Sequence, residues 1–282
     1  KNPFACILTR SIASLKIWKF SEENLSLLEK HIIRESGEEI QFEKNGSFSL
    51  ASTEEEFSEL MNSYDLMKEL GINVEILNQD SIESRLNASG FVGGIKYVDD
   101  ASVHPVLLLD KIYSEFSEDK NFTLRENSEV FHIEQVGEYK RVHTKSGKLE
   151  APIIIMATNG YSAQLHPFFE DKIYPTRGQI LATEPLPKLL EGPCYANFVL
   201  DYFRQTPSGE IVIGGFRQLK KDAEVGYSDE VTDIIQDALE KFLRTHIPKI
   251  ESKKITHRWS GIMGFSADGQ PMVGAIPSDP QV

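Results

Sequence analysis

Several features that would assign this chain of 282 residues to a class at once are missing from it. No apolar run approaches the roughly 18 residues that a membrane-spanning helix needs, so we expect no membrane partner. The N-terminal stretch KNPFACILTRSIASLKIWKF has no clean apolar segment of the kind that a secretory signal requires. These two absences predict a cytoplasmic protein.

Cysteine is equally scarce. Cys6 and Cys194 are the only two, and neither belongs to a C-x-x-C pair or lies near a Cys/His cluster. The spacing excludes a disulfide framework and the usual zinc sites, while one disulfide stays open. The seven histidines are scattered and no two have metal-ligand spacing, so we expect no metal site.

Basic residues are outnumbered, with 30 Lys and Arg against 43 Asp and Glu and a net charge of −13. A diffuse acidic surface repels phosphate backbones and anionic lipids, which argues against nucleic-acid and membrane partners. The composition is 40% hydrophobic and 26% charged, as in ordinary globular proteins, and the length allows one large domain or two smaller ones.

The common catalytic motifs are absent as well. No two glycines lie two residues apart, so G-x-G-x-x-G does not occur, and neither do Walker A, HExxH or GxSxG sequences. His104 precedes a predicted helix and is interpreted as a turn or cap contact. His257 lies on the last predicted strand, close to any site built there, although a structural role is the simpler interpretation. No residue stands out as a catalytic nucleophile, acid or base.

The first half of the chain reads as mixed helix and strand. A helix is predicted over Ser14 to Arg34, and Asn45-Gly46 between two alternating runs predicts a β-hairpin. Thr53 to Glu56 form a capping-box sequence before an apolar helical pattern that Gly71 ends. A strand, a loop and a helix opened by Pro105 follow.

Three β segments are predicted next, over Val130–Gln135, Tyr139–Thr144 and Ile153–Met156. The third opens the stretch IIIMATNGYS, an apolar run without alternation that leads into a small polar turn. Such a run is typical of a strand covered on both faces, as in a parallel sheet between helices.

The last third is predicted to be mostly β. DYFRQTPSGEIVIGGFR reads as two strands around Pro207-Ser208-Gly209, and Asp268-Gly269 reads as a second tight turn. Between them, an apolar stripe from Val231 to Leu243 predicts a helix that Pro248 ends. Helices and strands in this order favour an α+β architecture interleaved with part of an α/β domain.

Four arginines lie on or next to the predicted strands. An arginine fork can hold a substrate carboxylate through two parallel bonds, but most strand arginines are solvated or make weak ion pairs. The four candidates are Arg177, Arg204, Arg217 and Arg258.

Four segments together resemble one protein family. They are GGIKYVDDASVHPVLLL, IIIMATNGYS with the following IYPTRGQILATEPLP, DYFRQTPSGEIVIGGFR, and WSGIMGFSADGQPMVG. In this order and spacing they are similar to the flavin-dependent oxidoreductases of the D-amino-acid oxidase, glycine oxidase and sarcosine oxidase superfamily. The resemblance covers residues 90 to 280, and KNPFACILT resembles the segment that follows the family's first flavin-binding unit.

The resemblance implies an α+β fold, with an antiparallel-sheet substrate domain interleaved with the remaining strands of a truncated FAD-binding α/β domain. Residues 1–37, 100–165 and 255–282 would belong to the FAD-binding part, and residues 38–99 and 166–254 to the substrate domain. The cofactor implied is FAD, and the reaction is oxidation of a C–N bond in an amine or amino acid by hydride transfer to the flavin.

Site residues also follow from the resemblance. The positions that match cofactor contacts are Val130, Ala157, Thr158, Asn159, Gly160, Gly261 and Ile262. The positions expected to line the substrate cavity are Tyr202, Arg204, Met263 and His257. Tyr202 and Arg204 share one strand face by their period of two, and we expect that face to meet Met263.

The chain departs from the family in two ways. Met263 stands where glycine oxidase has an arginine that grips the substrate carboxylate, so another arginine or a larger amine substrate is expected. The family's opening G-x-G-x-x-G unit and its final glycine-rich segment are not in this sequence, so we expect an interior fragment of a longer enzyme. By itself the fragment is expected to be inactive, to lose FAD and to self-associate through uncovered sheet.

Two alternatives stay open at this point. One is a non-catalytic binding or interaction module that retains the substrate-domain fold. The other is a subunit whose flavin-binding half comes from another chain. Substrate identity, the electron acceptor and the oligomeric state do not follow from the residues.

Overall fold

The computed structural model describes residues 12–282, with side chains from residue 15 onward. Cys6 and the KNPFACILT segment therefore lie outside the described residues. The chain divides into two compact units. Unit 1 contains the described residues up to Phe122 together with Gln179–Phe216 and Val231–Trp259. Unit 2 contains Thr123–Gly178, Arg217–Glu230 and Ser260–Val282.

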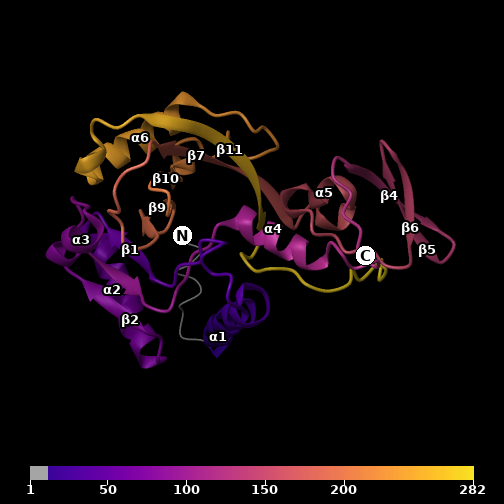
Figure 1. Cartoon of the computed structure of the whole chain (residues 1–282), viewed down its shortest axis with the longest axis horizontal. Helices are drawn as coiled ribbons and strands as arrows, with labels where there is room; N and C mark the ends of the chain where they lie inside the picture. The colour runs from indigo at the N-terminus through magenta and orange to yellow at the C-terminus, as the bar shows by residue number, and fades with distance from the viewer. Residues whose placement is uncertain (1–11) are drawn as a thin grey trace. The chain divides into compact units, whose positions relative to one another are not determined.

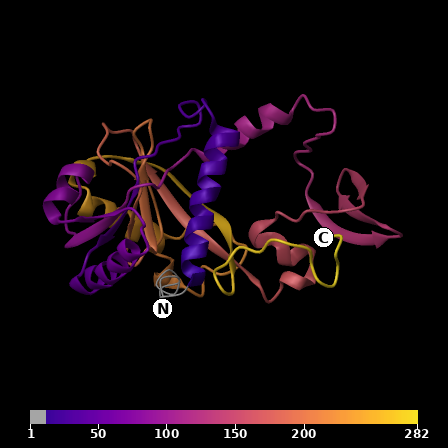
Figure 2. The same ribbon diagram turned by 90° about the horizontal axis from the view of Figure 1, so that it is seen from below.

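The helices of the described chain begin and end largely at residues favoured by local capping and turn preferences (Figure 1). α1 forms one continuous rod, the indigo helix of Figure 2, and continues into a short π-helix. The helix bounds are α1 Ile12–Leu28, α2 Glu54–Glu69, α3 Gln79–Leu86, α4 Pro105–Phe116, α5 Ser162–Leu165 and α6 Asp233–His246. The π-helix is η1 Glu29–Ile33, and the short 3-10 turns are Asn159–Tyr161, Pro167–Phe169, Arg217–Lys220 and Pro248–Ile250.

Side-chain caps explain three of the helix starts. Thr53 accepts a hydrogen bond from the Glu56 N–H at the start of α2, and Asn78 accepts one from the Ser81 N–H at the start of α3. His104 Nδ1 accepts from the Leu107 N–H at 3.3 Å, which confirms the predicted cap role of this histidine. Gly71, with φ of +78°, ends α2 as predicted.

One eight-stranded sheet runs in the order β11-β7-β10-β9-β8-β1-β3-β2. β1 pairs in parallel with β8, and the pairings β1–β3, β2–β3, β8–β9, β9–β10 and β10–β7 are antiparallel. The bounds are β1 Ser47–Ala51, β2 Val74–Leu77, β3 Gly93–Tyr97, β7 Ile173–Thr183, β8 Cys194–Ala196, β9 Asp201–Gln205, β10 Ile211–Gly214 and β11 Ile255–Ser266. The predicted mixed fold with a mainly antiparallel sheet is confirmed.

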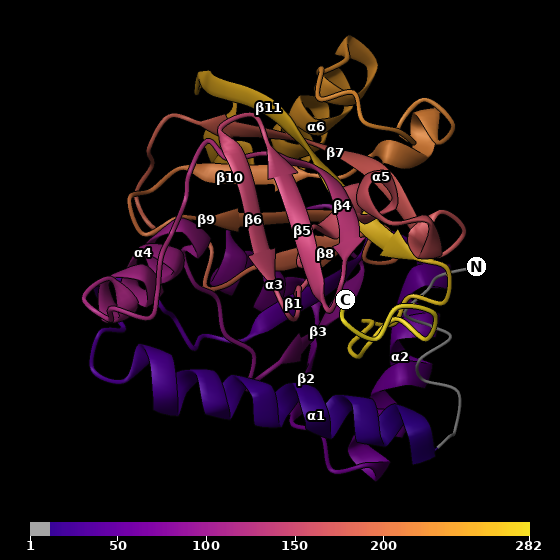
Figure 3. The same ribbon diagram turned by 90° about the vertical axis from the view of Figure 1, so that its right-hand side faces the viewer.

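A separate three-stranded antiparallel sheet lies in unit 2 and faces the viewer in Figure 3. Its strands are β4 Val130–Val136, β5 Tyr139–Thr144 and β6 Gly147–Ala151, with Gly137 and Gly147 at the turns between them.

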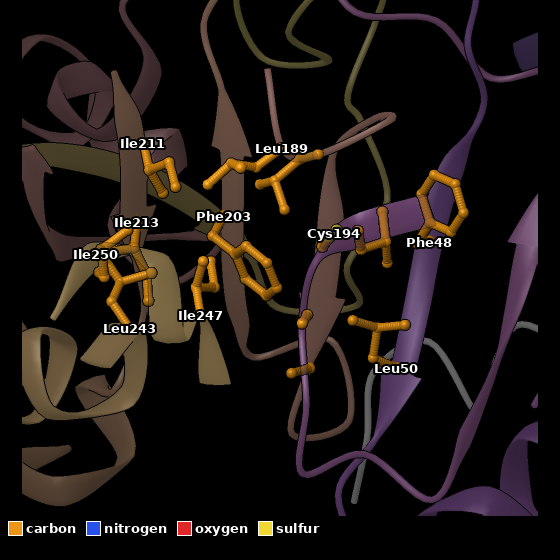
Figure 4. Close-up of a cluster of buried hydrophobic side chains, with 14 of the residues drawn as sticks. Phe48, Leu50, Leu189, Cys194, Phe203, Ile211, Ile213, Leu243, Ile247 and Ile250 are labelled. Carbon is orange, nitrogen blue, oxygen red and sulfur yellow. The ribbon is translucent and has the colours of Figure 1, made fainter. Parts of the chain in front are cut away.

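The main core of unit 1 lies between the sheet and α6 (Figure 4). Ile235, Leu239 and Leu243 form the buried stripe of α6 and pack in one cluster with sheet residues such as Phe203 and Ile213. This stripe is narrower than predicted, because Val231 precedes the helix and Ile234 points to solvent. A second cluster joins α1 and α2 to the β2–β3 end of the sheet through Met67, Ile72, Val74 and Ile95, with Trp18 and Tyr97 packed against it.

The predicted hairpin at Asn45-Gly46 is wrong. β1 begins at Ser47, but the residues before Asn45 form no strand, and β1 pairs with β3 and β8 instead. All five residues of β1 are buried, so both edges of this strand need ladder partners. The β3 partner comes so close that a Cβ on Gly94 would lie 2.6 Å from the Ser49 carbonyl oxygen.

The predicted strand over Ile153–Met156 is also wrong. The third strand of that region is β6, and residues 153–158 are irregular, with Ile155 88% exposed. A strand needs neighbours for its N–H and C=O groups. Among the described residues the only backbone bond of Ile153–Met156 outside helices and strands is from the Ile154 N–H to the Gln281 carbonyl.

An ion cluster ties Glu191 to β3 and α3 in unit 1. The carboxylate accepts from Arg85 Nε and Nη2 at 2.5 and 2.7 Å and from Lys96 Nζ at 2.8 Å. These donors, Arg85 first, lower the pKa of Glu191 to about 2 from its ordinary 4.5. Both cations also lie near the ring of Phe48, at 5.4 and 5.5 Å from its centroid.

Glu191→Gln is expected to lower the free energy of unfolding at neutral pH by about 2 kcal/mol, the usual loss for a hydrogen-bonded charged group. Because the folded-state pKa is depressed, the contribution is full above about 4.5 and is lost as the pH falls toward about 2. Urea unfolding at pH 7 and pH 3 measures both effects, with the exposed Glu83→Gln as control. An unchanged acid dependence in Glu191→Gln would contradict the assignment.

Candidate functional site

One face of the sheet in unit 1 carries the predicted substrate residues. Along β9 the burial alternates, with Asp201, Phe203 and Gln205 buried and Tyr202 and Arg204 on the opposite face, less deeply covered. Phe203 belongs to the core under α6, so Tyr202 and Arg204 point away from α6. We call this surface the open face of the sheet.

Neighbouring strands extend the open face by their register. Tyr195 of β8 lies directly opposite Tyr202, and Ser49 of β1 lies opposite Tyr195. On the other side Gly214 of β10 pairs with Tyr202, and a Cβ at this glycine would lie 2.6 Å from the tyrosine ring. The glycine therefore lets the ring of Tyr202 lie directly against the β10 backbone.

Arg204 is held loosely. Its Nη1 donates to the Val103 carbonyl at 3.3 Å, and among the described residues it forms no ion pair. A guanidinium has five N–H donors in a planar fork, so most of its donors are left for another acceptor.

The other three candidate arginines are engaged. Arg177 makes a bidentate buried pair with Glu224, and Arg258 donates to Gln236 of α6 and pairs with Glu240. Arg217 lies over the ring of Phe265 at 4.6 Å from its centroid. Arg204 is therefore the candidate of the four with the most free donors in the described part of the chain.

His257 and Trp259 belong to the open face by alternation. Arg258 lies between them and contacts α6, so its two neighbours on β11 point to the other side. Within the described part of the chain, the His257 ring bonds only to the Thr256 hydroxyl, at 3.0 Å, and Trp259 is 40% exposed. His257 thus lies on the same sheet face as Tyr202 and Arg204.

A polar cluster that the sequence does not predict adjoins these residues. Tyr97 shares a hydrogen bond with the Ser49 hydroxyl, and Asp100 accepts one from the Ser47 hydroxyl. Burial raises the pKa values of Tyr97, Tyr195 and Asp100 above their ordinary values. The Asp99-Asp100 pair was visible in the sequence, but nothing local indicated that the chain places it beside β8.

In unit 2, two predicted cofactor segments come together. Asn159, with φ of +49°, accepts a bond from the Gly264 N–H at 2.7 Å. A Cβ on Gly160 would lie 3.1 Å from Ile262, so the turn at residues 157–160 packs directly on β11. Gly261 is exposed and has open space where a side chain would be.

A groove of about 1160 Å³ lies beside this turn within unit 2. Its lining is largely apolar and comes from three segments, residues 153–159, 264–266 and 269–277, with a few residues from elsewhere. Ala157, Thr158 and Asn159 are among the lining residues. Val130 is not among them; it opens β4 and pairs with Thr144.

Met263 is half-buried on β11, between Ile262 and Gly264. It belongs to unit 2, whereas Tyr202, Arg204 and His257 belong to unit 1. The expectation that Met263 shares a cavity with Tyr202 and Arg204 stays a prediction.

Two searches among the described residues were negative. No group of three or more His, Cys, Asp or Glu side chains is placed to hold a metal ion. No described helix has the length and apolar character needed to cross a membrane. Cys194 is a free, buried thiol.

Comparison with known proteins agrees with this layout. The family described as DAO, FAD dependent oxidoreductase, matches residues 6–282. The probable oxidoreductase OrdL of Rhizobium meliloti (strain 1021) is 26% identical over 71% of this chain and 46% of its own length. Glycine oxidase of Bacillus subtilis (strain 168) is 26% identical over 88% of this chain and 64% of its own length.

The fold is shared with solved structures. Glycine oxidase from Geobacillus kaustophilus superposes with a TM-score of 0.78 at 21% identity, covering 96% of this chain and 72% of that protein. This chain belongs to the FAD dependent oxidoreductase family. It spans about half to two-thirds of the length of the curated relatives it matches.

The residues present fit part of an FAD molecule. The apolar groove, the exposed Ala157 and the open space at Gly261 let a flat ring approach the backbone. A pyrophosphate needs clustered backbone N–H donors at a helix start, and the G-x-G-x-x-G turn that usually supplies them is not in the sequence.

Proposed function

We propose that this chain is part of an enzyme that oxidises the C–N bond of a small amino acid or amine, with hydride transfer to FAD. The observation that carries the proposal is Arg204, a guanidinium with free donors on the open face, next to Tyr202. Family membership and the glycine oxidase relative support the cofactor and the substrate class.

Four residues of the open face have a role in the proposal. Arg204 binds the substrate carboxylate through paired N–H donors, which fixes the orientation of the substrate. Tyr202 and Tyr195 give a flat, largely apolar wall with neutral hydroxyls, because burial keeps the Tyr195 phenol protonated. His257 offers a further hydrogen bond at the β11 side.

The methionine at position 263 fits this arrangement. A thioether cannot bind a carboxylate, but it can contact the apolar part of a substrate. We assign the carboxylate-binding role to Arg204 instead, on β9. The alternative is a larger amine without a carboxylate, for which Arg204 would be dispensable.

For the cofactor we propose the turn Ala157–Gly160 with Gly261 and Ile262, and Val130 toward the adenine. FAD supplies the electron-accepting chemistry when it is bound, so the protein residues need to bind, orient and exclude water. We keep the assignment of residues 1–37, 100–165 and 255–282 to the FAD-binding part, and of residues 38–99 and 166–254 to the substrate part.

We call the longer enzyme of which this chain is proposed to be part the parent protein. The proposal is tested by mixing the flavin-loaded parent protein with candidate substrates in the absence of oxygen. The panel contains glycine, sarcosine, D- and L-alanine, L-proline and butylamine. Loss of flavin absorbance with one or more amino acids, and formation of the matching keto acid or aldehyde, is the expected result. Reduction by butylamine alone would favour the amine alternative, and no reduction by any compound would refute the proposed function.

A separate prediction concerns this chain by itself, which is not expected to retain FAD. The pyrophosphate is anionic, the chain has a net charge of −13, and no G-x-G-x-x-G turn offsets the repulsion. The measurement is a visible spectrum after incubation with excess FAD and desalting, with the parent protein as control. Retention of about one flavin per chain would show that the cofactor is held elsewhere.

A further inference from the structure

The turn between β8 and β9 has an unusual backbone. Three consecutive residues, Asn197, Phe198 and Val199, have φ values of +53°, +54° and +67°. Asparagine tolerates this left-handed region, but a β-branched valine rarely adopts it, because its Cβ crowds the neighbouring carbonyl. The turn therefore carries local strain that other contacts must hold in place.

A buried carboxylate from α2 holds the turn. Glu56 is 4% exposed, and its Oε1 accepts a hydrogen bond from the Phe198 N–H at 2.7 Å. Its Oε2 accepts from the Ser52 N–H at 2.8 Å. Among the described residues Glu56 forms no ion pair, and both of its carboxylate oxygens accept from backbone N–H groups.

The sequence explains Glu56 only as part of a capping box, in which it would bond the N–H of Thr53. In the structure one oxygen reaches the residue before the cap, and the other reaches across to Phe198, 142 positions along the chain. Helix capping does not require this second contact.

Asp201 holds the other end of the turn. Its Oδ2 accepts from Asn197 Nδ2 at 3.0 Å, and its Oδ1 accepts from the Phe216 N–H at 2.6 Å. Asp201 immediately precedes Tyr202 on β9, and Ala196 pairs with Asp201 at the last position of the hairpin.

The strained turn thus joins the two tyrosines of the open face. Tyr195 and Tyr202 lie opposite each other on β8 and β9, one residue pair away from the turn. A change in the turn would shift the angle of both strands and move the two rings relative to each other. By the two-residue alternation Arg204 lies on the same face of β9 as Tyr202, two positions further from the turn.

We propose that Glu56 is a positioning residue for the substrate: it fixes the strained turn and so sets the Tyr195–Tyr202 pair and Arg204. This inference rests on the proposed function for its consequence in catalysis. The claim that Glu56 fixes the turn does not depend on the proposed function.

Glu56→Gln is the first variant, because a carboxamide has one acceptor oxygen and cannot serve both N–H groups. Losing a hydrogen bond to a charged group is expected to speed amide exchange in the turn by about tenfold or more. In the flavin-loaded parent protein we expect KM for the best substrate to rise by about tenfold, with kcat changed by less than about threefold. Glu55→Gln, an exposed change in the same helical turn, is the matched control and should alter neither quantity.

Val199→Gly is the second variant. Glycine adopts positive φ without strain, so this change should leave KM near the wild-type value. In the double variant it should reverse most of the Glu56→Gln effect on both exchange and KM. A role of Glu56 in α2 stability alone would not respond to a change at Val199.

The measurements are hydrogen–deuterium exchange of peptides covering residues 195–205 and steady-state kinetics. Unchanged exchange in Glu56→Gln, or a double variant no better than Glu56→Gln, would overturn the proposal. If Glu56→Gln does not fold, Glu56→Asp, which shortens the same carboxylate by one methylene, takes its place, and unchanged exchange at residues 195–205 in that variant would overturn the proposal. If no amine is oxidised, the proposed function fails, and the exchange data still decide whether Glu56 fixes the turn.

Discussion

Arg177→Met is expected to lower the free energy of unfolding by about 3 to 5 kcal/mol, the usual cost of leaving one partner of a buried ion pair alone. Arg177 and Glu224 are 5% and 1% exposed, both in unit 2. Two parallel bonds of 2.9 and 2.8 Å join them, and the backbones bond as well, from the Arg177 N–H to the Glu224 carbonyl at 2.7 Å.

Arg177 also donates to the Ser228 hydroxyl and the Ala223 carbonyl. Removing it would take two charge-assisted bonds from a buried carboxylate, and one donor each from the Ser228 hydroxyl and the Ala223 carbonyl. The loop at residues 217–230 has little regular structure beyond one 3-10 turn, so this pair is the main polar contact between that loop and β7.

Thermal unfolding measures the effect, which we expect as a fall in melting temperature of about 10 °C. Two further variants give the expected contrast. Lys145→Met breaks a well-exposed ion pair with Glu129 in the same unit and should change stability by less than about 0.5 kcal/mol. Arg177→Met with Glu224→Leu should recover part of the loss, because no charge is then left buried. A fall no larger than that of Lys145→Met would contradict the buried-pair interpretation.

Local patterns predicted the elements that local contacts determine. Thr53 caps α2, Pro105 opens α4, and Pro207 to Gly209 turn β9 back along β10. Each of these features depends on hydrogen bonds or dihedral preferences within a few residues, so the sequence window contains the full cause.

Pairings between distant segments could not be predicted in the same way. Asn45-Gly46 has good hairpin residues, yet β1 finds its partners about 50 and about 145 positions further on, in β3 and β8. Gly93 and Gly94 permit the close approach, since side chains there would meet Phe57 and the Ser49 carbonyl. Turn propensity is a weak preference that burial of a whole strand overrides.

The apolar run Ile153–Met156 is a second case in which distant partners, and not local composition, decide the structure. Its composition is that of a buried strand, but a strand forms only where neighbouring strands complete its ladder. In the described chain these residues line the groove of unit 2 instead.

The candidate site was predictable in part. Alternation alone places Tyr202 and Arg204 on one face, and the structure has them there. The free donors of Arg204 could not be predicted, because they distinguish it from three arginines whose partners are distant in the sequence. Arg258 bonds to α6, Arg177 to Glu224, and Arg217 lies over Phe265. Tyr195 joins the face through the register of β8 with β9, and Asp100 through its hydrogen bond with Ser47 of β1, and both contacts join segments that local sequence windows do not connect.

Arg204→Ala in the flavin-loaded parent protein is expected to raise KM for a carboxylate substrate by about 30-fold or more. That factor corresponds to about 2 kcal/mol, the usual worth of charge-assisted bonds to a carboxylate. The reason is that Arg204 keeps most of its donors free on the open face, while its single bond, to the Val103 carbonyl at 3.3 Å, is weak. Folding should be little affected, because the side chain forms no ion pair among the described residues.

Two controls separate binding from folding. Arg258→Met removes a neighbouring strand arginine that faces α6, and it should lower stability without raising KM, because its bonds go to Gln236 and Glu240. Arg204→Lys keeps the charge but loses the planar fork, and it should recover only part of the affinity.

The proposed binding of the substrate carboxylate by Arg204, the carboxylate clamp, also makes a prediction for substrate analogues. In the wild-type protein an analogue with an amide or no carboxylate should lose as much affinity as the acid loses in Arg204→Ala. Normal KM in Arg204→Ala, or a melting temperature that falls as far as that of Arg177→Met, would refute the clamp. In that case the substrate would have to be an amine without a carboxylate.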